Sequence, residues 1–251
     1  MPADFRRDSI RSSLVWNVLR AVVSARVAAT GRPALDIVDV GGGTGGLAVP
    51  FAALGHNVTV VDPSPDALAA AQRRAAEAAA RLTSVQGEAA SLDSVVGPGA
   101  ADLVICHNVL EYVEEPADAM SAIARVLRPS ATVSVIASNA VAAVLHRALA
   151  GRFAEARRLL MSGMSGGTPL TAPASPLGRR FTLPELTALV ERAGLRAGEA
   201  HGLRIFGGLV PGALLEGDAA ATEALRALEE AAASTPPLRD IAAQLHVLGH
   251  R

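Results

Sequence analysis

The stretch that decides the fold class is Leu35-Asp36-Ile37-Val38-Asp39-Val40-Gly41-Gly42-Gly43-Thr44-Gly45-Gly46. A run of strand length, residues 35–40, passes directly into a loop that contains five glycines. Glycines at 41, 43 and 45 allow the backbone to turn tightly and to approach a ligand, while the loop amides open toward the next helix N-terminus. The pattern predicts a strand-to-helix turn that binds a nucleotide-like ligand.

Alternating strand and helix patterns continue on both sides of this loop. Strand-like runs follow at residues 57–61, 83–86, 101–106 and 131–137, and helical patterns lie near residues 46–54, 65–81 and 116–127. This alternation is typical of an α/β fold with a mostly parallel sheet and helices on both faces.

Other segments add to this predicted core. Helices are expected over residues 9–29, from Thr182 to Gly194 and over about 218–233, with an amphipathic tail at the end. Residues 129–145 are interpreted as a buried strand and the turn after it. Residues 162–178 are dense in Gly, Pro, Ser and Thr, which predicts a long loop or lid.

Composition narrows the classes of function. All 23 basic residues are arginine, so mechanisms that need a lysine Schiff base or a P-loop lysine are excluded. The net charge of -1 favours no particular partner. The single Cys106 forms neither an intrachain disulfide nor a zinc cluster, and no metal is expected. With no secretory core near residue 1 and no apolar run of membrane-spanning length, we expect a cytoplasmic protein without a membrane segment.

The glycine loop alone does not define the ligand. Gly41-x-Gly43-x-x-Gly46 also satisfies the dinucleotide fingerprint, and Asp62 lies near the distance expected for a ribose-binding acid. At this point an NAD(P)-dependent oxidoreductase stays open. A glycine turn that only packs a helix on a strand is a further alternative.

Three features resemble class I methyltransferases, which use S-adenosylmethionine (SAM). Asp39 before the glycines gives the Asp-x-Gly-x-Gly-x-Gly pattern of their motif I. Asp62 matches the acid that binds both ribose hydroxyls of SAM through charge-assisted hydrogen bonds. Residues 101–113 and 127–129 look like their fourth strand, the segment after it and the entry to the fifth strand.

The resemblance implies a Rossmann-like fold with a mostly parallel seven-stranded sheet, helices on both faces, an N-terminal helix and a lid-like insertion. We therefore expect a single methyltransferase domain over residues 1–251. Its parts would be an N-terminal cap helix at 1–32, a SAM-binding core at 33–140, an insertion or lid at 141–181, and a part at 182–251 that completes the sheet and the substrate pocket.

The same resemblance implies which positions bind SAM: Arg11, Asp39, Gly41, Gly43, Gly45, Asp62, Glu88, Ala89 and His107. Glu88 and Ala89 occupy the place that meets the adenine, although Glu88 also fits a solvated loop acid. His107 lies at the end of the fourth strand, near the methyl donor. The alternative is a half-buried histidine whose ring nitrogens are hydrogen-bonded within the protein and that has no role toward SAM.

A closer resemblance is to the bacterial tRNA 5-carboxymethoxyuridine methyltransferases. It rests on residues 11–16, the glycine loop and residues 107–113, 138–140, 149–153, 202–206 and 245–247, almost end to end. It implies that Arg11 reaches the carboxylate of SAM and that Arg204 lies beside the substrate pocket. The lysine-rich stretch of these relatives is replaced by uncharged residues 162–177. Four further arginines allow two interpretations: Arg147, Arg152, Arg157 and Arg158. They supply a basic face that binds phosphates, or they belong to a solvated helix face.

The predicted reaction is transfer of the SAM methyl group to the carboxylate of 5-carboxymethoxyuridine in tRNA. A carboxylate is already ionised at neutral pH, so no catalytic base is required. Arg204, Asn139 and Tyr112 are the candidates that orient the acceptor. Alternatives are a SAM-dependent methyltransferase of a small molecule and, more distantly, an NAD(P)-dependent oxidoreductase or a noncatalytic SAM-binding protein.

Overall fold

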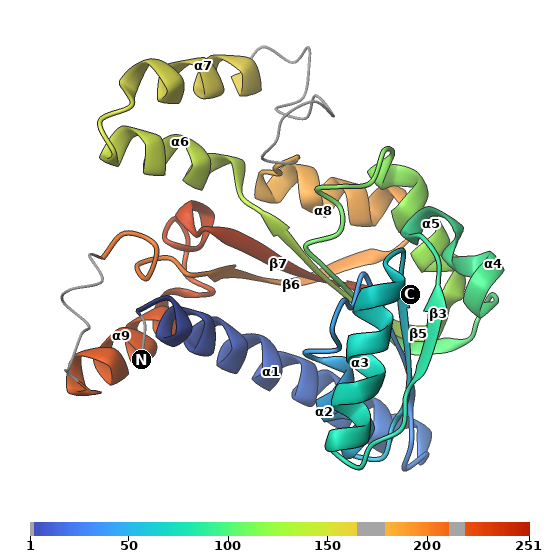
Figure 1. Cartoon of the computed structure of the whole chain (residues 1–251). Helices are drawn as coiled ribbons and strands as arrows, with labels where there is room; N and C mark the ends of the chain where they lie inside the picture. Colours follow the sequence, from blue (N-terminus) through green and yellow to red (C-terminus); the bar gives the residue numbers. More distant parts are fainter. Residues whose placement is uncertain (1–2, 165–178, 211–218) are drawn as a thin grey trace. The chain divides into compact units, whose positions relative to one another are not determined.

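The computed structural model describes residues 3–164, 179–210 and 219–251 (Figure 1). Within these ranges the strands form a seven-stranded sheet in the order β3-β2-β1-β4-β5-β7-β6. The strands are β1 (Asp36–Val40), β2 (Asn57–Asp62), β3 (Thr83–Gln86), β4 (Ala101–His107), β5 (Leu127–Ser138), β6 (Arg196–Leu203) and β7 (Gln244–His250). The pairings β1 with β2, β1 with β4, β2 with β3 and β4 with β5 are parallel. The predicted Rossmann-like, mostly parallel sheet is confirmed.

Helices connect these strands. They are α1 (Ala3–Thr30), α2 (Ala48–Ala53), α3 (Pro65–Glu77), α4 (Leu92–Val96), α5 (Pro116–Val126), α6 (Ala140–Leu149), α7 (Phe153–Met164), α8 (Leu183–Arg192) and α9 (Ala219–Ala232), with short 3-10 turns η1 (Ala89–Ser91) and η3 (Arg239–Ile241). Within the described ranges, no helix combines the length and the apolar character needed to cross a membrane.

Three local expectations were wrong. The turn expected after the buried strand is the helix α6, because the side chain of Asn139 accepts a hydrogen bond from the Val141 amide and starts a helix in an alanine-rich segment. The amphipathic tail contains β7, whose central residues are buried. Residues 162–164 of the predicted loop belong to α7, and residues 165–178 lie outside the described residues.

The contacts of the chain divide it into two compact units. Unit 1 consists of Met1–Leu19, Ala137–Leu186 and Glu199–His246, and includes α6, α7 and α9. Unit 2 consists of Arg20–Ile136, Thr187–Gly198 and Val247–Arg251, and includes the glycine loop and the strands β1 to β4. The single domain over residues 1–251 stays a prediction.

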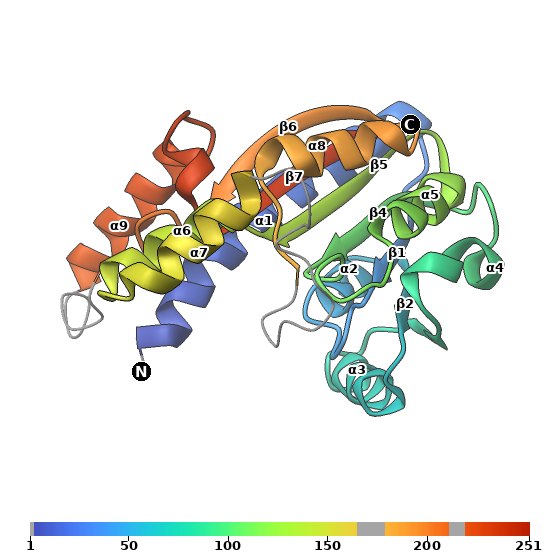
Figure 2. The ribbon, with the colours of Figure 1, turned by 90° about the horizontal axis from the view of Figure 1, so that it is seen from above.

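Unit 2 has the layered arrangement that places a ligand site at one edge of a sheet. Figures 1 and 2 show α2 and α3 on one side of its strands and α4 and α5 on the other. The central strands are covered on both faces, since residues 37–40 of β1 and 101–106 of β4 are all buried. Ser64 caps α3 by accepting a hydrogen bond from the Ala67 amide at 3.3 Å, and Pro65 begins that helix.

A cluster of charged side chains around the buried Asp102 lies at the opposite ends of the central strands. The side chain of Asp102 in β4 is inaccessible to solvent and accepts hydrogen bonds from Arg26 Nη2 at 3.0 Å, Arg32 Nη1 at 2.9 Å and Arg128 Nη1 at 2.7 Å. Asp36 at the start of β1 pairs with Arg32 and Arg128. We call these five residues the Asp102 cluster; it joins the last turns of α1 to the sheet.

Burial by itself raises the pKa of Asp102, but hydrogen bonds from the Asp36 amide and Arg26, together with the nearby arginine charges, outweigh it and lower the pKa. The carboxylate is therefore ionised in the folded protein, and its negative charge offsets the positive charges of the three surrounding arginines. An uncharged side chain at this position would leave the guanidinium groups to repel one another.

Replacing Asp102 by asparagine is expected to destabilise the protein by about 2 to 3 kcal/mol, less than for a fully buried pair because the arginines are partly exposed. Urea denaturation at neutral pH measures the change. Asp93→Asn is the matched control: it removes the exposed pair with Arg125 and should alter the midpoint little. Equal midpoints for the two variants would contradict a structural role for the cluster.

Candidate functional site

The glycine loop after β1 adopts a conformation that favours glycine. Gly41, Gly43 and Gly45 have φ values of +64°, +53° and +76°, in the left-handed region where other residues are strained. The Gly41 amide donates to the Val61 carbonyl at 2.7 Å, which ties the loop to β2. A Cβ at position 41 would also collide with Val109. The predicted tight turn is therefore present.

Asp62 at the end of β2 holds the loop from the side. Its Oδ2 accepts the Gly43 amide at 2.9 Å, and its Oδ1 accepts the Ser64 amide at 2.9 Å. The residue is only 8% exposed. Because each carboxylate oxygen has a second lone pair, both oxygens can still accept a hydrogen bond from a ligand.

Asp39 lies beneath the loop. Burial, and to a smaller extent the charge of Asp62, raises the pKa of Asp39 to about 7. A Cβ at position 42 would lie 2.7 Å from Asp39 Oδ2, so the carboxyl group packs directly against Gly42. Gly42 was not singled out by the sequence analysis, and only the packing shows why it has no side chain.

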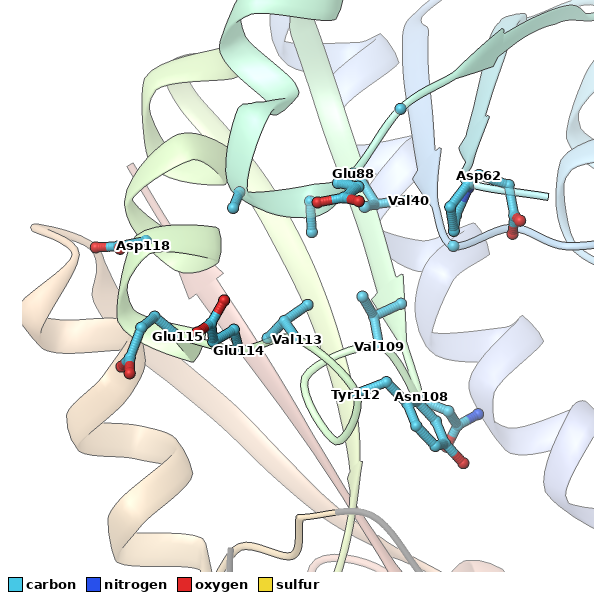
Figure 3. A pocket seen from close by; sticks show the side chains of 15 residues that line it. Val40, Asp62, Glu88, Asn108, Val109, Tyr112, Val113, Glu114, Glu115 and Asp118 are labelled. Carbon is cyan, nitrogen blue, oxygen red and sulfur yellow. The ribbon is translucent and has the colours of Figure 1, made fainter. Parts of the chain in front are cut away.

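A cavity of about 680 Å³ opens beside the loop, at the carboxyl ends of the parallel strands. This volume suits a ligand of cofactor size, and this edge of the sheet is where such folds bind ligands. It is lined by Val40, Gly41, Asp62, Pro63, Gly87, Glu88, Ala89, Ala90, Asn108, Val109, Tyr112, Val113, Glu114, Glu115 and Asp118. Figure 3 shows Glu114, Glu115 and Asp118 on the side of the cavity away from Asp62.

The charge of the lining selects among ligands. Five of the described lining residues are carboxylates and none is an arginine: Asp62, Glu88, Glu114, Glu115 and Asp118. A negative lining disfavours phosphate groups and favours a ligand that carries positive charge. The cavity therefore fits a cationic nucleoside such as SAM better than a dinucleotide with a pyrophosphate.

Some of the predicted SAM-binding positions meet at this cavity. Gly41, Asp62, Glu88 and Ala89 line it, as does the acceptor candidate Tyr112, which is 78% exposed. The other three positions of the loop motif, Asp39, Gly43 and Gly45, form and support the loop without lining the cavity.

His107 and Arg11 are not part of the described lining. His107 ends β4, and its Nε2 lies 2.8 Å from Ser134 Oγ on β5, which fits a satisfied, half-buried histidine. The side chain of Arg11 lies outside the described residues. Their contacts with SAM stay predictions.

Of the residues after β4 that line the cavity, Tyr112 was predicted as a site residue, whereas Asn108 and Val109 were not. Asn108 has a φ of +56°. Asparagine is one of the few residues that tolerate this conformation, so an Asn after a buried strand was an available signal. The carboxylates of residues 114, 115 and 118 gave no comparable signal.

Unit 1 contains the other two acceptor candidates. Asn139 is 1% exposed; its Oδ1 accepts the Val141 amide, and its Nδ2 donates to the carbonyls of Asp240 and Ala242, each at 2.8 Å. These contacts anchor the start of α6 to the segment before β7. The amide thus has a structural task, and its role toward an acceptor stays a prediction.

Arg204 follows β6 in a left-handed conformation with a φ of +59°. The next three residues are fixed by the buried carboxylate of Glu229 in α9, which accepts the amides of Ile205, Phe206 and Gly207 at 2.8, 2.9 and 2.6 Å. Burial and the charge of Arg204 lower the pKa of His146 in α6. Arg204 is a half-buried cation, and the loop that follows it is held in place by the hydrogen bonds to Glu229.

Within the described residues, no group of His, Cys, Asp and Glu side chains is placed to hold a metal ion. Cys106 is buried in β4, where burial and the charges of Glu111 and Asp39 raise the pKa of its thiol far above the ordinary value. The thiol stays protonated at neutral pH, which makes it a core residue rather than a nucleophile.

The raised pKa of Asp39 predicts a pH-dependent stability. The folded protein keeps a proton on Asp39 up to a pH of about 7, whereas the unfolded chain releases it near pH 4, so stability falls as pH rises between these values. The loss is on the order of 4 kcal/mol at most. Asp39→Asn should lose this dependence and be more stable than the wild type at pH 8.

Urea denaturation from pH 5 to pH 8 measures the effect. Asp66→Asn, an exposed substitution in the first turn of α3, is the control and should keep the wild-type pH dependence. If Asp39→Asn also kept it, Asp39 would not be the group that titrates.

Part of the chain matches a known family. Residues 38–135 match the family model described as "Methyltransferase domain". This segment contains the glycine loop, Asp62, Glu88 and the loop after β4. The match favours the methyltransferase interpretation over the nicotinamide oxidoreductase.

Two curated relatives are named for different activities. The chain is 30% identical over 149 residues to the tRNA 5-carboxymethoxyuridine methyltransferase of Escherichia coli (strain K12), covering 59% of this chain and 55% of that protein. It is 33% identical over 133 residues to the ubiquinone biosynthesis O-methyltransferase of Xanthomonas campestris pv. campestris (strain B100), covering 51% and 52%. The chain thus spans about half the length of the curated relatives it matches, less than the nearly end-to-end similarity expected from the motifs.

A solved structure shows the same fold over a longer range. An S-adenosylmethionine-dependent methyltransferase from Mesorhizobium loti superimposes with a TM-score of 0.57 at 19% identity, covering 94% of this chain and 97% of that one. At this level of identity the likeness concerns the fold alone.

Proposed function

We propose that the chain, of which residues 38–135 match the methyltransferase domain model, is a class I SAM-dependent methyltransferase and transfers the methyl group of SAM bound in the cavity beside the glycine loop. The observation that carries the proposal is Asp62, whose carboxylate both fixes the loop and lines the cavity. The acidic lining complements the sulfonium and ammonium charges of SAM.

The residues of unit 2 have distinct roles in this proposal. Asp62 accepts hydrogen bonds from the two ribose hydroxyls, and the backbone of the loop at Gly41 approaches the cofactor closely. Glu88 and Ala89, which follow β3, meet the adenine. Asp39 acts indirectly, because its carboxyl group supports the loop from below.

Bound SAM supplies an activated methyl group for an in-line displacement. The protein then has to hold the acceptor near the methyl group and exclude water. An acceptor carboxylate is ionised at neutral pH, so no side chain needs to remove a proton. The half-buried cation of Arg204, braced by Glu229, suits the binding of such a carboxylate.

We propose 5-carboxymethoxyuridine in tRNA as the acceptor. The relative from Escherichia coli named for this activity and the Arg204 loop support the proposal. A small-molecule acceptor is the second candidate, supported by the ubiquinone biosynthesis relative and by a cavity lining that is acidic and hence unfavourable to phosphates. A cytoplasmic location stays a prediction.

Methyl transfer from labelled SAM into tRNA that carries 5-carboxymethoxyuridine tests both the proposed SAM-dependent activity and the proposed acceptor. The wild type should label the RNA, and Asp62→Asn should bind S-adenosylhomocysteine at least about tenfold more weakly because the charged acceptor of two hydrogen bonds is lost. Asp66→Asn is the control and should bind like the wild type.

Two results would change the proposed acceptor or contradict the proposed cofactor site. Tight binding of S-adenosylhomocysteine without label in the RNA would keep the cofactor site and favour a small-molecule acceptor. Unchanged binding by Asp62→Asn would contradict the assigned cofactor site.

Arg204→Ala is expected to lower turnover with the carboxylate acceptor roughly 100-fold because the acceptor is no longer oriented, while affinity for S-adenosylhomocysteine stays unchanged. Steady-state kinetics and calorimetric binding measure the two quantities. Arg196→Ala, which removes an exposed arginine at the start of β6, should leave both unchanged. Full turnover by Arg204→Ala would exclude Arg204 as the orienting residue.

A further inference from the structure

Helices α6 and α7 form a hairpin whose charge differs from that of the rest of the chain. The two helices lie side by side and are joined by residues 150–152 (Figures 1 and 2). Residues 140–164 carry four arginines against one carboxylate, whereas the whole chain has a net charge of -1. The hairpin is therefore a basic element on a slightly acidic protein.

The single carboxylate of the hairpin is used internally. Glu155 Oε2 lies 3.5 Å from Arg147 Nε, and Arg147 Nη1 also donates to the Ala143 carbonyl at 3.1 Å. These contacts offset the charge of Arg147. Arg152, Arg157 and Arg158 are all exposed, so the positive charge of the hairpin is concentrated on the solvent-facing side of α7 and the turn before it.

Apolar side chains accompany these arginines. Phe153 is 70% exposed, whereas Phe51 and Phe181 are 0% and 7% exposed. Positions 153, 157, 160 and 161 share one face of α7, because residues three, four and seven apart are neighbours on a helix. Leu160 and Met161, which complete this stripe, are 49% and 53% exposed. The stripe thus combines an aromatic ring, a guanidinium group and aliphatic side chains.

We propose that the α6–α7 hairpin is an RNA-binding surface: Arg152, Arg157 and Arg158 contact phosphates, and Phe153 stacks on an unpaired base. Arginines next to an exposed aromatic ring suit a single-stranded loop of RNA, whose phosphates and unstacked bases need both. This inference rests on the proposed tRNA substrate and assigns its docking to residues other than those that line the acidic cofactor cavity.

An anionic membrane surface is the competing partner, since exposed leucine and methionine also bind lipid. An interfacial helix, however, presents a continuous apolar face with its cations along the edges. Here Arg157 lies within the apolar stripe, between Phe153 and Leu160, and a lipid-inserted face would have to bury its charge. The arrangement therefore favours RNA.

Binding of fluorescent tRNA to the full chain, measured by anisotropy at several salt concentrations, tests the surface. The double variant Arg152→Ala/Arg157→Ala should bind about tenfold more weakly, with a slope of log affinity against log salt that is shallower by roughly two. Phe153→Ala should weaken binding about tenfold at an unchanged slope. Arg73→Ala/Arg196→Ala removes the same charge from exposed positions on α3 and β6 and should bind like the wild type.

The outcomes separate this inference from the proposed function. A wild type that methylates tRNA, with hairpin variants that bind it unchanged, would overturn the docking surface and leave the function standing. A wild type that neither binds nor methylates tRNA, while it still binds S-adenosylhomocysteine, would overturn both. Binding to vesicles of phosphatidylcholine and phosphatidylserine that Phe153→Ala abolishes, without tRNA binding, would replace RNA by a lipid partner.

Discussion

The packing of the Asp39 carboxyl group against the backbone of Gly42 is the constraint on which the site depends. No side chain fits between the end of β1 and the loop, so the loop lies directly over this carboxyl group. The register places Asp39 opposite Val60 in β2, two residues before Asp62. Asp62 can therefore hold the Gly43 amide and also line the cavity, which means that two carboxylates on adjacent strands fix the shape of the ligand site.

The sequence predicts the first half of the fold better than the second, because in the first half charged residues, glycines and prolines mark the ends of the apolar runs. The strands β1, β2 and β4 are short apolar runs between glycines, prolines and charged residues, so their limits are visible. From 129 to 145 the chain is uncharged through both β5 and α6, and periodicity cannot separate them without recognising Asn139 as a cap. In β7, His246 and Gly249 interrupt the apolar pattern, yet the strand is buried through its centre.

The candidate site shows the same limit. The glycine loop and Asp62 were predictable because their roles depend on residues close in sequence. Glu114, Glu115 and Asp118 line the cavity from the end of the segment after β4 and the first turn of α5, a placement that depends on the tertiary fold and not on local pattern. Asn139 reaches carbonyl groups more than 100 residues away, so its structural contacts could not be derived from local pattern.

The Asp102 cluster has a consequence for how this fold diversifies. It lies at the amino ends of β1 and β4, whereas the cavity opens at their carboxyl ends. Substitutions that remodel the acceptor side can thus accumulate without touching the contacts that join α1 to the sheet. A scaffold anchored in this way tolerates changes of specificity, which is consistent with relatives of similar identity that are named for a nucleic acid acceptor and for a quinone pathway.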